Sequence, residues 1–183
     1  MIAVQDNQDS APSVNNKNRD QRFVDTVIDR CQKDKGMAAR LRRADNPATE
    51  YQSWELLGWF GVNIEKDYER LPFVTVAAAI AKSKVERNGS LALGKAILAC
   101  YENDPEDGQA KARLRRLLAC DELAEVCRVL RPVLTLIDSK TRQPLDYIRL
   151  LRQLRFFGHR TKTQWAQEFY GRAVGVEGVE GVA

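Results

Sequence analysis

The residues of this chain best suited to chemistry are arginines at helical spacings. Arg149, Arg152 and Arg155 follow one another at intervals of three. On a helix they would sweep an arc of about 120°, with cations roughly 4.5 to 6 Å apart, comparable with phosphate spacing along a single strand. The row therefore predicts contact with a phosphate backbone. The same cluster continues into His159, Arg160 and Lys162, and His159 is the one histidine of the chain.

Two further basic clusters repeat this pattern. In the cluster at residues 111–116, leucines take the opposite side of the helix, as in an amphipathic helix. Few acids interrupt the helical rows, so we expect that salt bridges between residues four apart do not occupy these cations. The residues concerned are Arg40, Arg42 and Arg43 in one cluster, and Lys111, Arg113, Arg115 and Arg116 in the other.

A solvated helix face is the alternative interpretation of any single row, but three clusters in one small chain favour binding. The sequence contains no helix-turn-helix, zinc-finger or RNA-recognition pattern, which predicts binding without base readout. Trp54, Trp59 and Trp165 stand on apolar faces. We therefore expect them to pack in the core and not to serve as stacking platforms.

Groups that could carry catalysis are scarce. The sequence has no glycine-rich phosphate loop, no H-E-x-x-H and no Cys/His cluster with zinc spacing. Asp121, Glu122 and Glu125 are placed as first-turn acids of a helix, which favour its dipole. The acidic residues of segment 102–107 predict a solvated loop and not a cation site. These observations predict a protein that is not an enzyme and has no catalytic residue, metal or cofactor.

The bulk composition agrees with a compact protein that meets a polyanion. Of 183 residues, 44% are hydrophobic and 30% are charged, and the net charge is +4. Residues 109–172 alone carry an excess of eight positive charges. An uneven basic segment of this kind suggests a nucleic-acid partner. The four cysteines form no C-x-x-C pair and predict buried free thiols, which together with the lack of a secretory signal suggests the cytoplasm.

The periodicity is helical almost throughout and predicts an all-α fold of two small lobes. Pro132 lies inside an apolar helical run, so we expect a kink or break near Arg131. Pro72 is expected in the first turn of a helix. The predicted organisation is a disordered polar tail at 1–20, an N-terminal lobe at 21–102, a linker loop at 103–108, a basic C-terminal lobe at 109–172 and a flexible Gly-Val-Glu tail at 173–183.

Ordered motifs give the chain a resemblance to a known family. They are SLALGKAI, ARLRRLL, CRVLRPVL and PLDYIRLLRQLRFFGHRTKTQWAQEFYG, in that order. Their order and spacing resemble those of CasB proteins, the small subunits of type I-E CRISPR Cascade complexes. The resemblance covers residues 21–172, and its most specific part is LDYxxLLxxLxxF followed by WAxEFYG.

The resemblance implies a non-catalytic, two-lobed helical subunit in antiviral defence. Its implied partners are guide RNA, target DNA, the displaced DNA strand, the large subunit, the backbone subunits and a second copy of itself. It also implies that the subunit stabilises the R-loop. Carried over by position, its basic contacts fall on Arg42, Arg43, Lys95, Arg113, Arg131, His159 and Arg160. Pro132 stands where the family has a second basic residue, and His159 is only partly charged near neutral pH.

Two other function classes remain open from the residues alone. One is a helical adaptor whose basic faces bind acidic protein surfaces. The other is a small RNA-processing enzyme, which the missing catalytic groups disfavour. Co-purification with guide RNA and larger subunits would separate the surveillance subunit from the adaptor.

Overall fold

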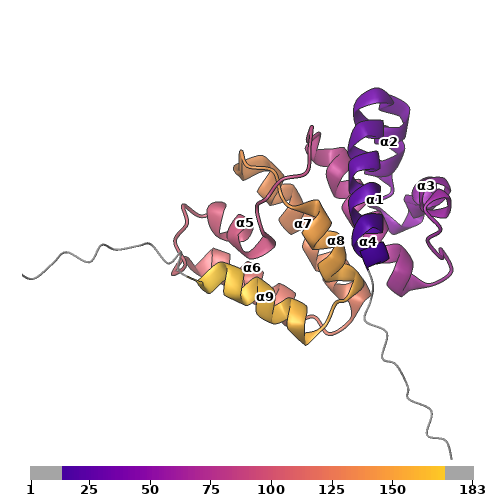
Figure 1. The fold of residues 1–183 in the computed structure, drawn as a ribbon. Helices are drawn as coiled ribbons and strands as arrows, with labels where there is room; N and C mark the ends of the chain where they lie inside the picture. Colours follow the sequence, from indigo (N-terminus) through magenta and orange to yellow (C-terminus); the bar gives the residue numbers. More distant parts are fainter. Residues whose placement is uncertain (1–13, 172–183) are drawn as a thin grey trace, which may run out of the picture.

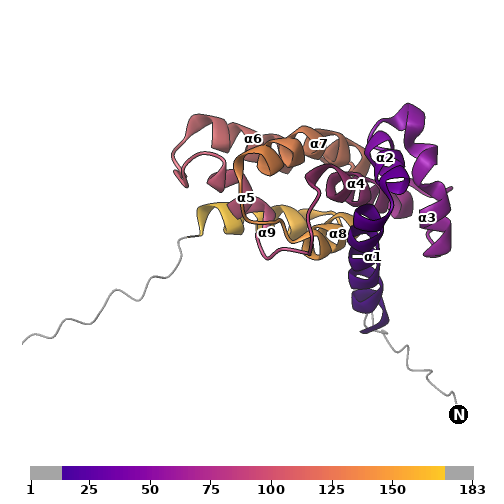
Figure 2. The same ribbon diagram turned by 90° about the horizontal axis from the view of Figure 1, so that it is seen from above.

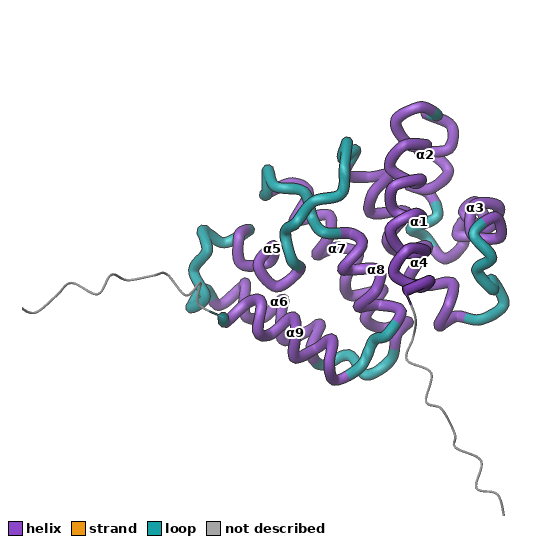
Figure 3. Tube along the Cα trace, viewed as in Figure 1, coloured by secondary structure: helices purple, strands orange, loops and turns teal. Residues whose placement is uncertain are grey.

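The protein, described here by a computed structural model of residues 14–171, is built from helices (Figures 1 and 3). Within that range no residue belongs to a β-strand, and the predicted all-α class is confirmed. The elements are α1 (Val14–Lys33), α2 (Lys35–Arg43), the 3-10 helix η1 (Pro47–Ser53), α3 (Trp54–Trp59), α4 (Asp67–Ser83), α5 (Leu93–Ala99), α6 (Gly108–Leu118), α7 (Leu123–Lys140), α8 (Tyr147–Arg155) and α9 (His159–Tyr170).

Aspartates begin three of the helices by accepting hydrogen bonds from free backbone N–H groups. Asp34 accepts from Met37 at the start of α2. Asp107 accepts from the second and third residues of α6, and Asp146 accepts from the N–H of Arg149 in α8. Such caps satisfy donors that have no partner inside the helix. They set the point at which each basic row begins.

Helix α4 is the centre of the packing. Its residues 71–81 are all buried, and α1, α2, α7 and α8 lie against it. A helix that is apolar on every side is suited to this central position. Pro72 is the sixth residue of α4 and not a first-turn residue as predicted, because the helix already begins at Asp67.

Helices α5, α6 and α9 form the other end of the molecule, with α7 and α8 between the two ends (Figures 1 and 2). Side chains on both sides of the predicted linker at 103–108 share one hydrophobic core. Helices from the second half therefore pack on α4 in the first half. The division into two lobes at that loop stays a prediction. No helix among residues 14–171 is both long and apolar enough to cross a membrane.

The predicted boundary of the N-terminal tail is wrong over residues 14–20. Helix α1 begins at Val14, and Asp20 near its start is buried. Polar composition predicted disorder there, but the carboxylate of Asp20 pairs with Arg155 of α8, a contact that no local pattern reveals. The remaining tail predictions, 1–13 and 173–183, lie outside the described residues. Helix α7 runs through Pro132 without a break, and the kink that was the other expectation there stays a prediction.

A clasp joins the segment before α5 to the segment before α8. Leu91 and Leu145 form an isolated parallel bridge, and the N–H of Gly89 donates to the carbonyl of Leu145 at 3.1 Å. The side-chain oxygen of Asn88 accepts from the N–H of Tyr147 at 2.8 Å. A Cβ on Gly89 would lie 1.8 Å from the carbonyl oxygen of Pro144, so glycine allows the two segments to approach. The clasp thus fixes where α8 begins.

The four thiols are free, and two of them, Cys120 and Cys127, are buried. Burial raises the pKa of Cys127 to about 11. Because the thiolate is the reactive form, we expect iodoacetamide at pH 8 to leave Cys127 unmodified in the native protein and to modify it in guanidinium chloride. Peptide mass spectrometry measures both. Complete modification of Cys127 in the native protein would contradict the packing of α7 on α4.

Candidate nucleic-acid interface

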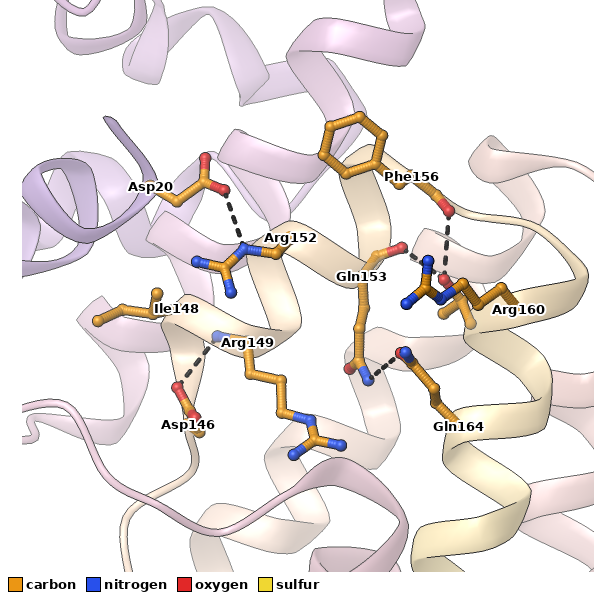
Figure 4. A pocket seen from close by; sticks show the side chains of 10 residues that line it. Asp20, Asp146, Ile148, Arg149, Arg152, Gln153, Phe156, Arg160 and Gln164 are labelled. Atoms are coloured by element: carbon orange, nitrogen blue, oxygen red, sulfur yellow. Dashed lines mark hydrogen bonds and ion pairs between the residues drawn. The ribbon is translucent and has the colours of Figure 1, made fainter. Parts of the chain in front are cut away.

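A cleft of about 730 Å³ lies along α8 and α9 (Figure 4). Helix α8 contributes Arg149 and Arg152, and α9 contributes Arg160. The cleft therefore combines two members of the predicted row with a third arginine from the next helix. Its other lining residues are Asp20, Asp146, Ile148, Gln153, Phe156, Thr161 and Gln164.

The amphipathic pattern of α8 directs its arginines to the cleft. Leu150, Leu151 and Leu154 are at most 1% exposed and pack into the core. The side chains of Arg149 and Arg152 remain 47% and 41% exposed. Because i and i+3 positions share a helix face, the two guanidinium groups line one wall of the cleft.

Two buried carboxylates hold these arginines. Arg149 lies 2.5 Å from Glu168 of α9, and Arg152 lies 3.9 Å from Asp20 of α1. The predicted absence of salt bridges between residues four apart agrees with α8, but both arginines pair with carboxylates from other helices. Desolvation by burial raises the pKa of Asp20, although the neighbouring arginines act in the opposite direction. The cleft is therefore less positive than the arginine row alone suggests.

Arg155, the third residue of the predicted row, is placed differently. Its side chain is only 13% exposed and pairs with Asp20. Its guanidinium lies 5.5 Å from the ring centroid of Phe73 and 5.4 Å from that of Phe156. Arg155 thus ties α8 to α1 and α4, and Arg160 takes the third cationic position in the cleft. Among residues 14–171, no carboxylate forms an ion pair with Arg160.

Hydrogen bonds between side chains connect α8 to α9 next to the cleft. The indole N–H of Trp165 donates to Oε1 of Gln153 at 2.8 Å. Nε2 of Gln153 donates to Oε1 of Gln164 at 3.2 Å (Figure 4) and to Glu168 at 3.4 Å. Oγ1 of Thr161 lies 3.1 Å from the backbone carbonyl of Gln153. These contacts fix α9 against α8.

The other predicted clusters lie away from this cleft, because none of their residues lines it. On α2, Arg40 and Arg43 are exposed, whereas Arg42 is half-buried and donates to the carbonyl of Ala81 at 3.5 Å. The α2 cluster thus offers two exposed cations and one that is partly used in packing.

The α6 cluster divides in the same way. Lys111 pairs with Glu106 at 2.6 Å, and Nε of Arg113 donates to the hydroxyl of Tyr101. Arg115 and Arg116 are exposed near the end of the helix. Two of the four predicted cations on α6 are therefore engaged within the protein.

Two more of the predicted contacts are ion-paired. Nε of Arg131 lies 3.3 Å from Asp45, and its side chain is 15% exposed. Nζ of Lys162 lies 3.0 Å from Asp121. His159 is exposed at the start of α9 but does not line the cleft. Among these three, only His159 is without a carboxylate partner in the described part of the chain.

Lys95 lies in a second groove, of about 540 Å³. Lys140 and Arg142, which stand outside the predicted basic clusters, line the same groove. Glu168 also lines it and pairs with Arg149 on the first cleft. A single buried carboxylate thus stands between the two basic surfaces.

The expected positions of the tryptophans are only partly confirmed. Trp165 is fully buried as predicted. The prediction for the other two is wrong: Trp54 is 40% and Trp59 66% exposed, because α3 is short and buries little more than Leu56 and Leu57. An exposed aromatic that sequence reasoning missed is Phe156, which is 54% exposed and lines the cleft.

The described residues contain no group of three histidine, cysteine, aspartate or glutamate side chains placed to hold a metal ion. What the cleft offers is arginines held in position by buried acids, together with an amide and an aromatic ring. Guanidinium groups of this kind bind phosphate through paired hydrogen bonds. The arrangement suits binding of a phosphate backbone.

Comparisons with known proteins give one consistent result. The family model described as CRISPR-associated protein Cse2 matches residues 37–170. A crystal structure of CasB from M. ruber is 26% identical with a TM-score of 0.64, covering 83% of this chain and 92% of that one. A chain of a CRISPR RNA-guided surveillance complex is 22% identical with a TM-score of 0.60, covering 84% and 91%, and shares the fold. A comparison with curated protein sequences found no match.

Proposed function

The chain belongs to the family of CRISPR-associated protein Cse2, and on that premise we propose that it is the non-catalytic small subunit of an RNA-guided Cascade complex. Its role is structural: it holds nucleic acid within the complex and cleaves nothing. The similarity to CasB and to a chain of a surveillance complex supports this proposal.

The observation that carries the nucleic-acid role is the cleft between α8 and α9. Arg149, Arg152 and Arg160 come from two helices and line one cleft. Phosphate contacts of this kind position a strand without reading its bases. We assign the displaced DNA strand to this cleft, and guide RNA, target DNA, the large and backbone subunits and a second copy to other faces of the subunit.

Replacing Arg149, Arg152 and Arg160 with glutamine tests this assignment. The full chain should bind a fluorescein-labelled oligothymidylate weakly, with log K falling as log salt rises. Each phosphate contact on a single strand contributes a slope of about −0.7, so loss of three contacts should flatten the slope by about 2. Fluorescence anisotropy between low and moderate KCl concentrations measures the slope, and gel analysis with Mg²⁺ should show the strand intact.

The matched control replaces Arg22, Arg87 and Arg128, which are exposed and lie outside the cleft. It removes the same charge and should change the slope little. Equal flattening by both triple variants would show that net charge alone drives binding. The alternative, an adaptor for acidic protein surfaces, predicts instead that polyglutamate competes with the strand as well as an unlabelled oligothymidylate does.

In the assembled complex, the cleft variant should shorten the lifetime of the R-loop while guide-RNA content stays unchanged. The reason is that the displaced strand loses its backbone contacts. Loss of guide RNA with an unchanged R-loop lifetime would place the RNA, not the displaced strand, in this cleft.

A further inference from the structure

We propose that the α8–α9 cleft holds one unstacked nucleotide of a single strand, with its base on Phe156 and its phosphate on Arg160 and the amide nitrogen of Gln164. This inference rests on the proposed nucleic-acid role and specifies how the ligand is held. It adds an aromatic contact and a neutral donor to the arginine contacts.

The orientation of the Gln164 amide follows from a donor that cannot reverse. An indole N–H only donates, so the hydrogen bond from Trp165 fixes the carbonyl end of the Gln153 amide. Gln153 must then present its nitrogen to Gln164, which accepts with Oε1. Nε2 of Gln164 is left as a pair of donors at the cleft, where its side chain is among the lining groups (Figure 4). A fully buried tryptophan thereby orients a cleft residue.

The carboxylates that line the cleft already accept from groups of the protein. The carboxylate of Asp20 pairs with Arg152, and that of Asp146 caps α8 by accepting from the N–H of Arg149. Besides Arg149 and Arg152 of α8, α9 brings two donors to the cleft, the guanidinium of Arg160 and the nitrogen of Gln164. They stand four residues apart on α9 and thus share one face of it. A ligand for this wall must be rich in acceptors, as a phosphodiester is.

Phe156, which directly follows α8, provides an apolar surface in the lining of the cleft. Oγ1 of Thr161 lies 3.2 Å from the carbonyl oxygen of Phe156, which fixes the backbone at the corner between the helices. The guanidinium of Arg155 lies over the ring, and 54% of the residue remains exposed. A supported and exposed ring of this kind stacks on a base of any sequence. The cleft volume of about 730 Å³ is sufficient for a nucleotide.

Two probes separate the base from the phosphate: a labelled oligothymidylate and an abasic strand of equal length, which keeps the phosphates and lacks the bases. Phe156→Leu should weaken binding of the oligothymidylate by about fivefold or more and leave binding of the abasic strand unchanged. Gln164→Leu should weaken binding of both strands. The control is Tyr170→Leu. Tyr170 is an exposed aromatic residue on α9 that does not line the cleft, so this variant should bind both strands as the unmodified chain does.

Equal weakening of both strands by Phe156→Leu, or no weakening of either, would overturn this proposal. The proposed function fails separately, if the Arg149, Arg152 and Arg160 variant binds both strands as the unmodified chain does. If Phe156→Leu does not fold, Phe156→Trp decides: it should bind oligothymidylate at least as tightly as the unmodified chain, with abasic binding unchanged. Weaker oligothymidylate binding by that variant would also refute base stacking at this position.

Discussion

Gly94→Ala should lower the free energy of unfolding by about 2–3 kcal/mol and the melting temperature by roughly 4–12 °C. A Cβ at this position would lie 2.4 Å from the carbonyl oxygen of Trp165 and 2.8 Å from the backbone nitrogen of Phe169. Both are backbone atoms of α9, so the helix itself must move to make room. Urea denaturation followed by circular dichroism measures the change.

Gly58→Ala is the matched control. Gly58 lies on the exposed side of α3, and a Cβ there would have no neighbour within 4 Å. Alanine has the higher helix propensity, so this variant should lose no stability. Equal stabilities for the Gly94 and Gly58 variants would mean that α5 and α9 are less closely packed than the structure shows.

Glu168→Ala should change stability and binding in opposite directions. The side chain is 8% exposed, and its Oε2 accepts from the buried N–H of Gly94 at 3.0 Å. Leaving that donor without a partner should cost about 1–3 kcal/mol of unfolding free energy. The same change removes the carboxylate that pairs with Arg149, so the folded protein should bind single-stranded DNA more tightly. Denaturation and anisotropy measure the two effects.

Two controls separate these contributions. Glu168→Gln keeps an acceptor for the N–H of Gly94 and should lose less stability than the alanine variant. Glu125→Ala removes one negative charge from an exposed position on α7 and should leave binding almost unchanged. A similar rise in affinity for Glu125→Ala would show that total charge, and not release of Arg149, causes the effect.

Helical periodicity predicted much of the core because local spacing decides which face a side chain occupies. Trp165 and Phe169 stand four apart on α9, and both are at most 1% exposed. Trp54 and Trp59 have similar apolar surroundings in sequence but lie on α3, a helix of six residues that buries little more than Leu56 and Leu57. Apolar neighbours predicted burial there, and tertiary packing did not provide it.

The candidate site was predicted in part, for a related reason. Spacing placed Arg149 and Arg152 on one face, and both line the cleft. The same spacing placed Arg155 with them, but Asp20 holds it from a helix 135 residues earlier in the chain. Pairings over such separations leave no trace in a local pattern. The amide chain from Trp165 to Gln164 is equally invisible, because it depends on how α8 and α9 face each other.

The pairing of Asp20 with Arg155 also has a consequence for biosynthesis. Because 135 residues separate the two partners, α1 is translated long before the arginine that neutralises its buried carboxylate exists. At elongation rates of about 5–20 residues per second, the delay is about 7–27 s. During that interval burial of the unpaired Asp20 carboxylate is unfavourable, so the start of α1 stays exposed to water. Although α1 is translated before α8, the start of α1 therefore completes its docking only after α8 has been made.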